Sequence, residues 1–129
     1  MDSARMLVVE DNETLLENIR EIFEFQELLK MDILTAENGE RALAVLHGLN
    51  KPLDLILCDV RMPVMDGITF LAAVQKEPRW AEIPFVFLTA ESEQSEIERG
   101  LRLGATDYIP KPYTVGGLID RVMTLIMRP

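Results

Sequence analysis

The sequence has few of the residues on which secreted, zinc-binding or membrane domains depend. Among 129 residues it holds one cysteine, one histidine and one tryptophan. A single cysteine excludes an internal disulfide, and a lone histidine without cysteine partners excludes the usual kind of zinc site. No apolar run approaches the roughly 20 residues that a membrane-spanning helix needs, and no signal-peptide core precedes the first apolar run. We therefore expect a cytoplasmic protein without a membrane segment.

Basic residues are also in the minority. Lys and Arg number 13 against 22 Asp and Glu, which gives a formal net charge of -9. This is the wrong sign for a domain that holds nucleic-acid phosphates, so we expect no direct nucleic-acid binding. Hydrophobic residues make up 48% and aromatic residues 6%. The chain can therefore bury an aliphatic core, and we expect one domain over residues 1–129 that folds without disulfides or structural metal.

Short apolar runs alternate with amphipathic stretches along the chain, which is the pattern of alternating strands and helices. The predicted helices carry apolar residues at spacings of three and four, with Asn38 and Thr114 as caps and Gly104 ending a fourth helix over residues 95–103. The predicted strands are residues 6–9, 31–36, 53–58, 85–88 and 107–109. Five such units predict an α/β fold, a doubly wound (βα)5 three-layer sandwich around a five-stranded parallel sheet.

Several polar residues follow the predicted strands. Glu10 and Asp11 follow the first strand, Asp59 ends the third, Thr89 ends the fourth and Lys111 follows the fifth. Because the carboxyl ends of parallel strands meet at one sheet edge, we expect these residues to converge there. Three carboxylates this close would repel one another unless a cation binds. Magnesium prefers hard oxygen ligands and keeps positions for water and phosphate oxygens, so the pattern indicates a site for phosphoryl transfer.

Four segments at these strand ends resemble one known family. Residues 8–12 (VVEDN), 59–67 (DVRMPVMDG), 88–90 (LTA) and 108–112 (YIPKP) are similar to the signature of response regulator receiver domains of two-component signalling, the chemotaxis-regulator-like fold. The four motifs occur in order over essentially the whole chain. The resemblance implies the flavodoxin-like strand order 2-1-3-4-5. It also implies a cis peptide bond between Lys111 and Pro112.

The resemblance further implies which residues bind the phosphoryl group and the metal. Asp59 is the implied phosphoacceptor, which takes the phosphoryl group from a histidine kinase or a phosphotransfer protein. Asp11, Asp59 and the backbone carbonyl of Arg61 are the implied ligands of Mg²⁺, and Glu10 acts mainly through metal-bound water. Such a domain catalyses only its own phosphorylation and dephosphorylation.

Other positions of the family pattern imply a switch. Lys111 pairs with the acyl phosphate and Thr89 hydrogen-bonds it, and both contacts are stronger after transfer than before. Tyr108 occupies the aromatic position expected to turn inward as Thr89 moves. Arg61 and Glu91, each two residues beyond a site residue, are expected to tune the lifetime of the phosphorylated state, and their opposite charges suggest a pair.

Two alternatives belong to other classes. A stand-alone phosphatase of the haloacid-dehalogenase-like type also uses acids and magnesium beside a doubly wound sheet, but its nucleophile follows the first strand in an Asp-x-Asp pattern, whereas Asp59 follows the third strand. A degenerate receiver that works only as an interaction module is disfavoured because the acids, Thr89 and Lys111 are all present.

The predicted fifth helix has an unusually wide apolar arc. Residues 115–127 spread apolar side chains over roughly 200° of a helical wheel, about twice the minimum stripe that faces a core. We therefore predict that a flank made of Ile119, Met123 and Met127 is exposed for a partner. A neighbouring loop or a longer native chain is the open alternative. The resemblance implies a homodimer or an output domain as partner, through the surface of the fourth helix, fifth strand and fifth helix.

Overall fold

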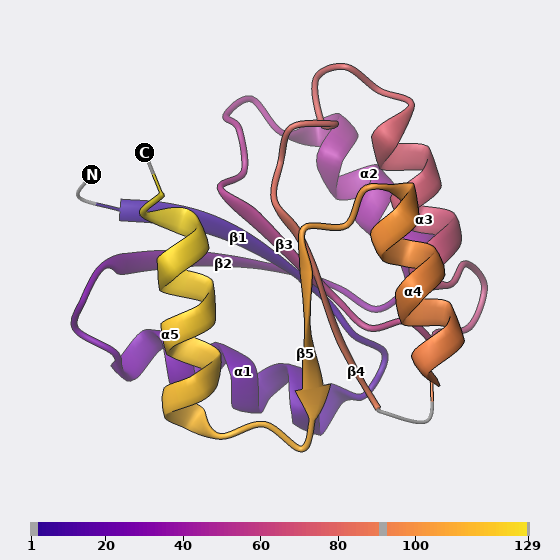
Figure 1. Cartoon of the computed structure of the whole chain (residues 1–129). Helices are drawn as coiled ribbons and strands as arrows, with labels where there is room; N and C mark the ends of the chain where they lie inside the picture. Colours follow the sequence, from indigo (N-terminus) through magenta and orange to yellow (C-terminus); the bar gives the residue numbers. More distant parts are fainter. Residues whose placement is uncertain (1–2, 91–92, 129) are drawn as a thin grey trace.

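The computed structural model describes residues 3–90 and 93–128, which form a parallel sheet between two layers of helices (Figure 1). The five strands lie in the order β2-β1-β3-β4-β5, which confirms the expected doubly wound topology. None of the helices in these ranges is long and apolar enough to cross a membrane. The elements in chain order are β1 (Ser3–Val9), α1 (Glu13–Phe25), β2 (Lys30–Ala36), α2 (Gly39–Gly48), β3 (Leu55–Cys58), α3 (Gly67–Gln75), β4 (Phe85–Ala90), α4 (Gln94–Leu103), β5 (Asp107–Lys111) and α5 (Val115–Ile126).

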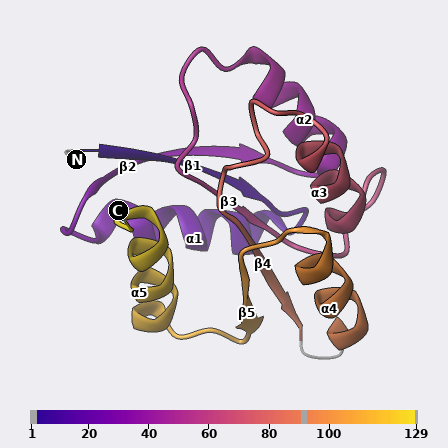
Figure 2. The ribbon, with the colours of Figure 1, turned by 45° about the horizontal axis from the view of Figure 1, so that its top comes forward.

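Neighbouring residues of the central strands enter two different apolar cores. On β3, Leu55 and Leu57 belong to the core shared with α1 and α5, whereas Ile56 and Cys58 belong to the core shared with α2 and α3. Figures 1 and 2 show α1 and α5 on one side of the sheet and α2, α3 and α4 on the other. Because both faces of β3 are covered, all four of its residues are apolar. Cys58, the single cysteine, is buried among these apolar residues.

Within residues 3–90 and 93–128, side chains cap four of the five helices. Asn12, Asn38, Asp66 and Thr114 each accept a hydrogen bond from the backbone N–H three residues further on, at the starts of α1, α2, α3 and α5. The predicted caps Asn38 and Thr114 are confirmed. At the start of α4, whose residues are all described, Glu93 occupies the cap position but its side chain makes no such bond. Among the described residues, Glu93 thus differs from the other four cap residues.

Strands β4 and β5 extend two residues further than their apolar runs predicted. Thr89 pairs with Pro110 and Ala90 with Lys111 in the parallel ladder, so the pairing continues to the last residue of each strand. Sequence reasoning ended both strands where the apolar residues stop. Conversely, β3 begins at Leu55, two residues later than predicted. The consequence for the site is that Thr89 and Lys111 lie within paired strands, where the backbone fixes their positions.

The prediction of an exposed flank on α5 is wrong for Met123, which is only 4% exposed. Ile119 is partly buried against the same core, and Met127 is exposed. The wide apolar arc of α5 is covered because this helix packs against α1 as well as against the sheet. One part of the arc contacts the sheet and another part contacts α1. The buried residues of α5 are Leu118, Val122, Met123, Leu125 and Ile126.

The only tryptophan packs at the end of the sheet where β3 begins. Trp80 lies in the α3–β4 connection and lines a surface hollow with Leu53, just before β3. Its ring contacts the His47 ring edge-on at 4.8 Å between centroids, and the Arg79 guanidinium lies 5.1 Å from the Trp80 centroid. Trp80 and His47 therefore belong to the packing of this end.

We predict that Gly100→Ala destabilises the fold through a clash between α4 and β4. A methyl group at Gly100 would lie 2.3 Å from Cε2 of Phe87, a buried ring in the centre of the sheet. Forcing such a contact should lower the free energy of unfolding by about 1–3 kcal/mol. Gly116→Ala on α5 is the control, because a methyl group there meets nothing within 4 Å. Urea unfolding of both variants measures the difference, and equal effects would contradict the close approach of α4.

Candidate functional site

Three carboxylates gather at the carboxyl ends of β1 and β3. Glu10 and Asp11 follow β1, and Asp59 follows β3, where its backbone N–H donates to the Val9 carbonyl at 3.0 Å. One carboxylate oxygen from each acid lies within 4.8 Å of the others. Glu10 and Asp59 are buried, whereas Asp11 is exposed. The structure thus brings together the acids that the sequence placed at one sheet edge.

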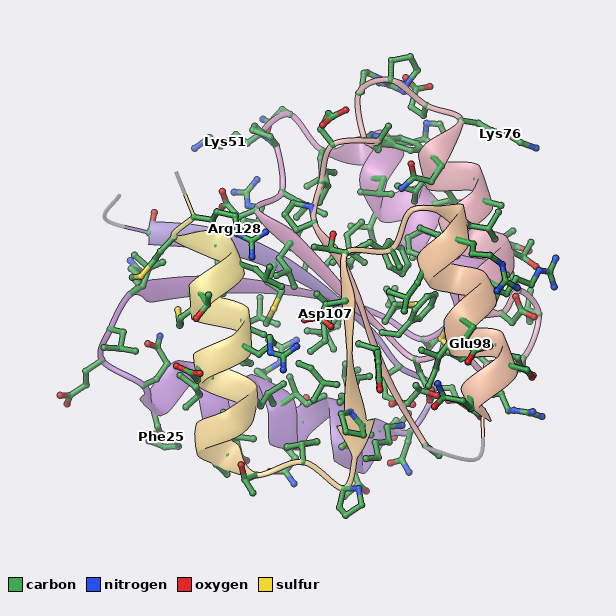
Figure 3. The ribbon with its side chains drawn as sticks, viewed as in Figure 1. Phe25, Lys51, Lys76, Glu98, Asp107 and Arg128 are labelled. Carbon is green, nitrogen blue, oxygen red and sulfur yellow. The ribbon has the colours of Figure 1, made fainter. Side chains whose placement is uncertain are left out.

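The ammonium group of Lys111 lies between two of these carboxylates. Its Nζ is 3.1 Å from Glu10 Oε1 and 3.2 Å from Asp59 Oδ2. Burial lowers the pKa of Lys111, but the charges of Asp59 and Glu10 raise it by more, so its pKa lies above the usual value and the group stays charged. The peptide bond after Lys111 is cis, as predicted. In Figure 3, Lys51 and Lys76 extend from the end of the molecule opposite the arrowhead of β5.

The backbone around Asp59 is held closely by its neighbours. The Val60 backbone N–H donates to Asp59 Oδ1 at 2.7 Å, so both carboxylate oxygens have a donor. The Gly67 N–H donates to the Val60 carbonyl at 2.8 Å, and a Cβ at Gly67 would lie 2.2 Å from the Asp59 carbonyl oxygen. Only glycine permits α3 to begin this close to Asp59. The carboxylate of Asp59 is therefore fixed before any ligand arrives.

The surroundings of Glu10 raise the pKa of its carboxyl group. Burial and the charge of Asp59 raise the pKa of Glu10, contacts with Lys111 and Asn12 lower it, and the result is about 7. The neutral form is favoured because a second negative charge beside Asp59 is costly in a poorly solvated position. A cation that binds this cluster would therefore compete with a proton on Glu10.

The donor atoms of this cluster fit magnesium. All three side chains offer carboxylate oxygens, the hard ligands that Mg²⁺ prefers, and no softer donor is needed. Arg61, whose backbone carbonyl belongs to the expected ligand set, lines one surface hollow together with Asp11. Because Lys111 supplies one positive charge to three carboxylates, the described cluster retains negative charge that a divalent cation would balance.

Thr89 is fully buried and its hydroxyl donates a hydrogen bond to the Glu93 carboxylate. Arg61 holds Glu93 at 2.7 Å and Glu96 at 2.9 Å, so its ion pairs lead from the β3–α3 loop to the start of α4. The expected partner of Arg61, Glu91, lies outside the described residues. Sequence reasoning missed Glu93, because a glutamate four residues after a strand-end threonine belongs to no motif.

Tyr108 lies on β5 directly beside Phe87 of β4. Its side chain is half-buried and packs against the core shared with α2 and α3. It therefore faces the same side of the sheet as α4, two residues before the Thr89 pairing position on β5. This placement is compatible with the expected switch position.

Fold and site together define an α/β protein with an acidic crevice that one lysine balances. The chain belongs to the response regulator receiver domain family, whose model matches residues 6–123. It is a receiver domain of the two-component type, a signalling domain. The sequence-based assignment is thus confirmed at the level of the family, and the phosphatase alternative is not supported.

Known relatives agree with this assignment. The transcriptional regulatory protein CpxR of Escherichia coli is 32% identical over 124 residues, which are 96% of this chain and 50% of that protein. The receiver domain of a Francisella response regulator is 29% identical with a TM-score of 0.84, over 98% of each chain. The receiver domain of a sensor histidine kinase from Pseudomonas aeruginosa is 26% identical with a TM-score of 0.83, over 96% of this chain and 98% of that one. That last structure holds a magnesium ion coordinated in its active site cleft. The chain spans about half the length of the curated relatives it matches.

We predict that Glu10 makes the metal-free protein less stable as the pH rises from about 4.5 to about 7. The folded protein keeps the Glu10 proton up to about pH 7, whereas an unperturbed glutamate has a pKa of 4.5. The folded state therefore binds more protons than the unfolded state in this interval, and its free energy of unfolding decreases as pH increases. Urea unfolding of the wild type and of Glu10→Gln, in a chelating buffer across this interval, measures the difference. A gap between the two proteins that stays constant with pH would contradict the raised pKa.

Proposed function

We propose that residues 1–129 act as one receiver domain in which Asp59 accepts a phosphoryl group from the phosphohistidine of a histidine kinase or a phosphotransfer protein. One observation carries this proposal. The buried Asp59 carboxylate is held by the Val60 N–H and the Lys111 ammonium inside a cluster of acids. In the transfer, a bond forms between an Asp59 carboxylate oxygen and phosphorus, and the bond between phosphorus and the histidine nitrogen breaks. The products are an acyl phosphate on Asp59 and a free histidine.

The chain's own side chains orient this reaction. Lys111 already contacts Asp59 Oδ2. Once Asp59 is phosphorylated, the Lys111 ammonium can pair with an oxygen of the phosphoryl group instead. Asp11, Asp59 and the Arg61 backbone carbonyl would hold Mg²⁺ directly, with Glu10 acting through water. When bound, the metal offsets the negative charge of the approaching phosphoryl group. The catalysis is limited to phosphorylation and dephosphorylation of Asp59 itself, and Arg61 and Glu91 tune the lifetime of the product.

The output would pass through the surface formed by α4, β5 and α5. Thr89 and Tyr108 lie on adjacent strands beneath α4. Within α4, whose residues are all described, only Ile97 and Gly100 are buried, so few apolar contacts resist a shift of this helix. Leu101 and Leu103 of this helix are 38% and 40% exposed. A second copy of the chain or an output domain is the partner that we expect on this surface.

We predict that Asp59→Asn abolishes labelling by acetyl phosphate with Mg²⁺, since an amide is neither an adequate nucleophile nor a good magnesium ligand. Mass spectrometry of the intact protein measures the phosphoryl group. Asp54→Asn is the control, because Asp54 precedes the same strand at its opposite end and only accepts the Arg5 backbone N–H at 2.8 Å, which an amide oxygen can also do. The control should be labelled like the wild type, and persistent acyl phosphate in Asp59→Asn would refute the assignment.

We also predict that Tyr108→Ala weakens the response of the α4-β5-α5 surface to beryllofluoride with Mg²⁺, a mimic of the phosphoryl group. The change should reduce the amide chemical-shift differences in these elements while leaving beryllofluoride bound at Asp59. Tyr108→Phe keeps the ring and should respond like the wild type. Unchanged shifts in Tyr108→Ala would remove this residue from the mechanism.

A further inference from the structure

Glu93 is a buried carboxylate outside the metal cluster, and its contacts lead directly to the switch. It is 8% exposed and stands at the cap position of α4, where a side chain usually bonds the first-turn N–H groups. Instead its carboxylate accepts the hydrogen bond of the Thr89 hydroxyl. Glu93 therefore serves Thr89 as an acceptor and does not cap the helix itself. A carboxylate is an unusually strong acceptor for a hydroxyl, so this contact should fix the Thr89 rotamer.

Arg61 completes the arrangement on the other side of Glu93. Its Nε lies 2.7 Å from Glu93 Oε1, while Thr89 bonds the other carboxylate oxygen, Oε2. The two partners of Glu93 thus use different oxygens and do not compete with each other. Arg61 is two residues beyond Asp59. The contacts of Glu93 therefore connect Thr89 with a residue close in sequence to the proposed phosphoacceptor.

The hydroxyl of Thr89 carries a single proton, and this creates a competition. A threonine hydroxyl donates one hydrogen bond, which is now directed to Glu93. A phosphoryl group on Asp59 would present new charged oxygen acceptors, and Thr89 cannot donate to these and to Glu93 at once. Any bond that Thr89 makes to the phosphoryl group therefore has to replace its bond to Glu93.

We propose that Glu93 is a positioning residue that holds the Thr89 hydroxyl in the unphosphorylated orientation, and that Arg61 keeps Glu93 in place when Thr89 leaves. This inference rests on the proposed role of Asp59. The ion pair with Arg61 matters because a buried carboxylate without any partner would be costly, and Glu93 keeps this ion pair when Thr89 turns away. Glu93 thereby lowers the affinity of the unphosphorylated domain for the phosphoryl group and couples Thr89 to the first turn of α4.

The first test compares beryllofluoride binding with Mg²⁺ in Glu93→Ala and in the control Glu96→Ala. Both changes remove one negative charge and one Arg61 partner, but only Glu93 contacts Thr89. We expect Glu93→Ala to bind beryllofluoride about tenfold more tightly than the wild type, the size of one hydrogen bond to a charged group. Glu96→Ala should bind within about threefold of the wild type, as expected for an exposed pair. Equal gains in the two variants would assign the effect to charge and overturn the proposal.

A double-mutant cycle isolates the contact itself. In the Thr89→Ala background the hydroxyl is absent, so adding Glu93→Ala should give no more gain than adding Glu96→Ala. A gain as large as in the wild-type background would show that Glu93 does not act through Thr89. Glu93→Gln keeps the size of the side chain and should give an intermediate gain, which tests the proposal even if Glu93→Ala does not fold.

The second test observes Thr89 in the unliganded protein and uses beryllofluoride-bound wild type only as the reference. The methyl chemical shift of Thr89 in the unliganded protein should move in Glu93→Ala towards its value in beryllofluoride-bound wild type, and should stay unchanged in Glu96→Ala. If the wild type binds no beryllofluoride, the proposed function of Asp59 fails, while a Thr89 methyl signal that moves from its wild-type position in Glu93→Ala and not in Glu96→Ala still supports the restraint by Glu93. If the wild type binds and the methyl signal of Glu93→Ala stays in place, the restraint by Glu93 is wrong and the role of Asp59 stands.

Discussion

The ammonium group of Lys111 is the one contact on which the carboxyl edge of this sheet depends. Glu10 and Asp59 come from different strands, are both buried, and would repel each other without a positive charge between them. Lys111 reaches both because β5 stays paired with β4 to its last residue. The order of the strands thus places Lys111, near the end of the chain, beside Glu10 and Asp59, which come much earlier in the sequence. One positive charge does not balance three carboxylates, and this imbalance makes the edge receptive to a cation.

Much of this arrangement could be predicted from the sequence, because it follows from patterns that repeat. Two patterns were enough to place all five βα units. Strands covered on both faces appear as apolar runs, and the helices between them carry apolar residues three and four positions apart. The carboxyl ends of parallel strands meet at one edge, so Glu10, Asp11, Asp59 and Lys111 had to converge. The strand order and the family followed from the resemblance, and both are confirmed.

The rest depends on contacts that no local pattern encodes. The strands end where pairing ends, and at Thr89 and Ala90 pairing continues beyond the apolar run. Met123 is buried because α1 happens to lie beside α5, which a helical wheel of α5 alone does not reveal. Glu93 looks like an ordinary acid at a helix start, and only the fold turns it towards Thr89 and Arg61. Partners far apart in sequence are invisible until the backbone brings them together.

The position of the only tryptophan decides what its fluorescence can report. Trp80 packs with His47 and Arg79 where β3 begins, whereas Asp59 follows the end of that strand. The side chain that directly follows Asp59 is that of Val60, which is not fluorescent. Emission from Trp80 should therefore follow global unfolding and respond little to changes at the acidic edge. To follow the acidic edge by fluorescence, a probe has to be introduced near Asp59. The alternative is to record the emission of Tyr108 and Tyr113.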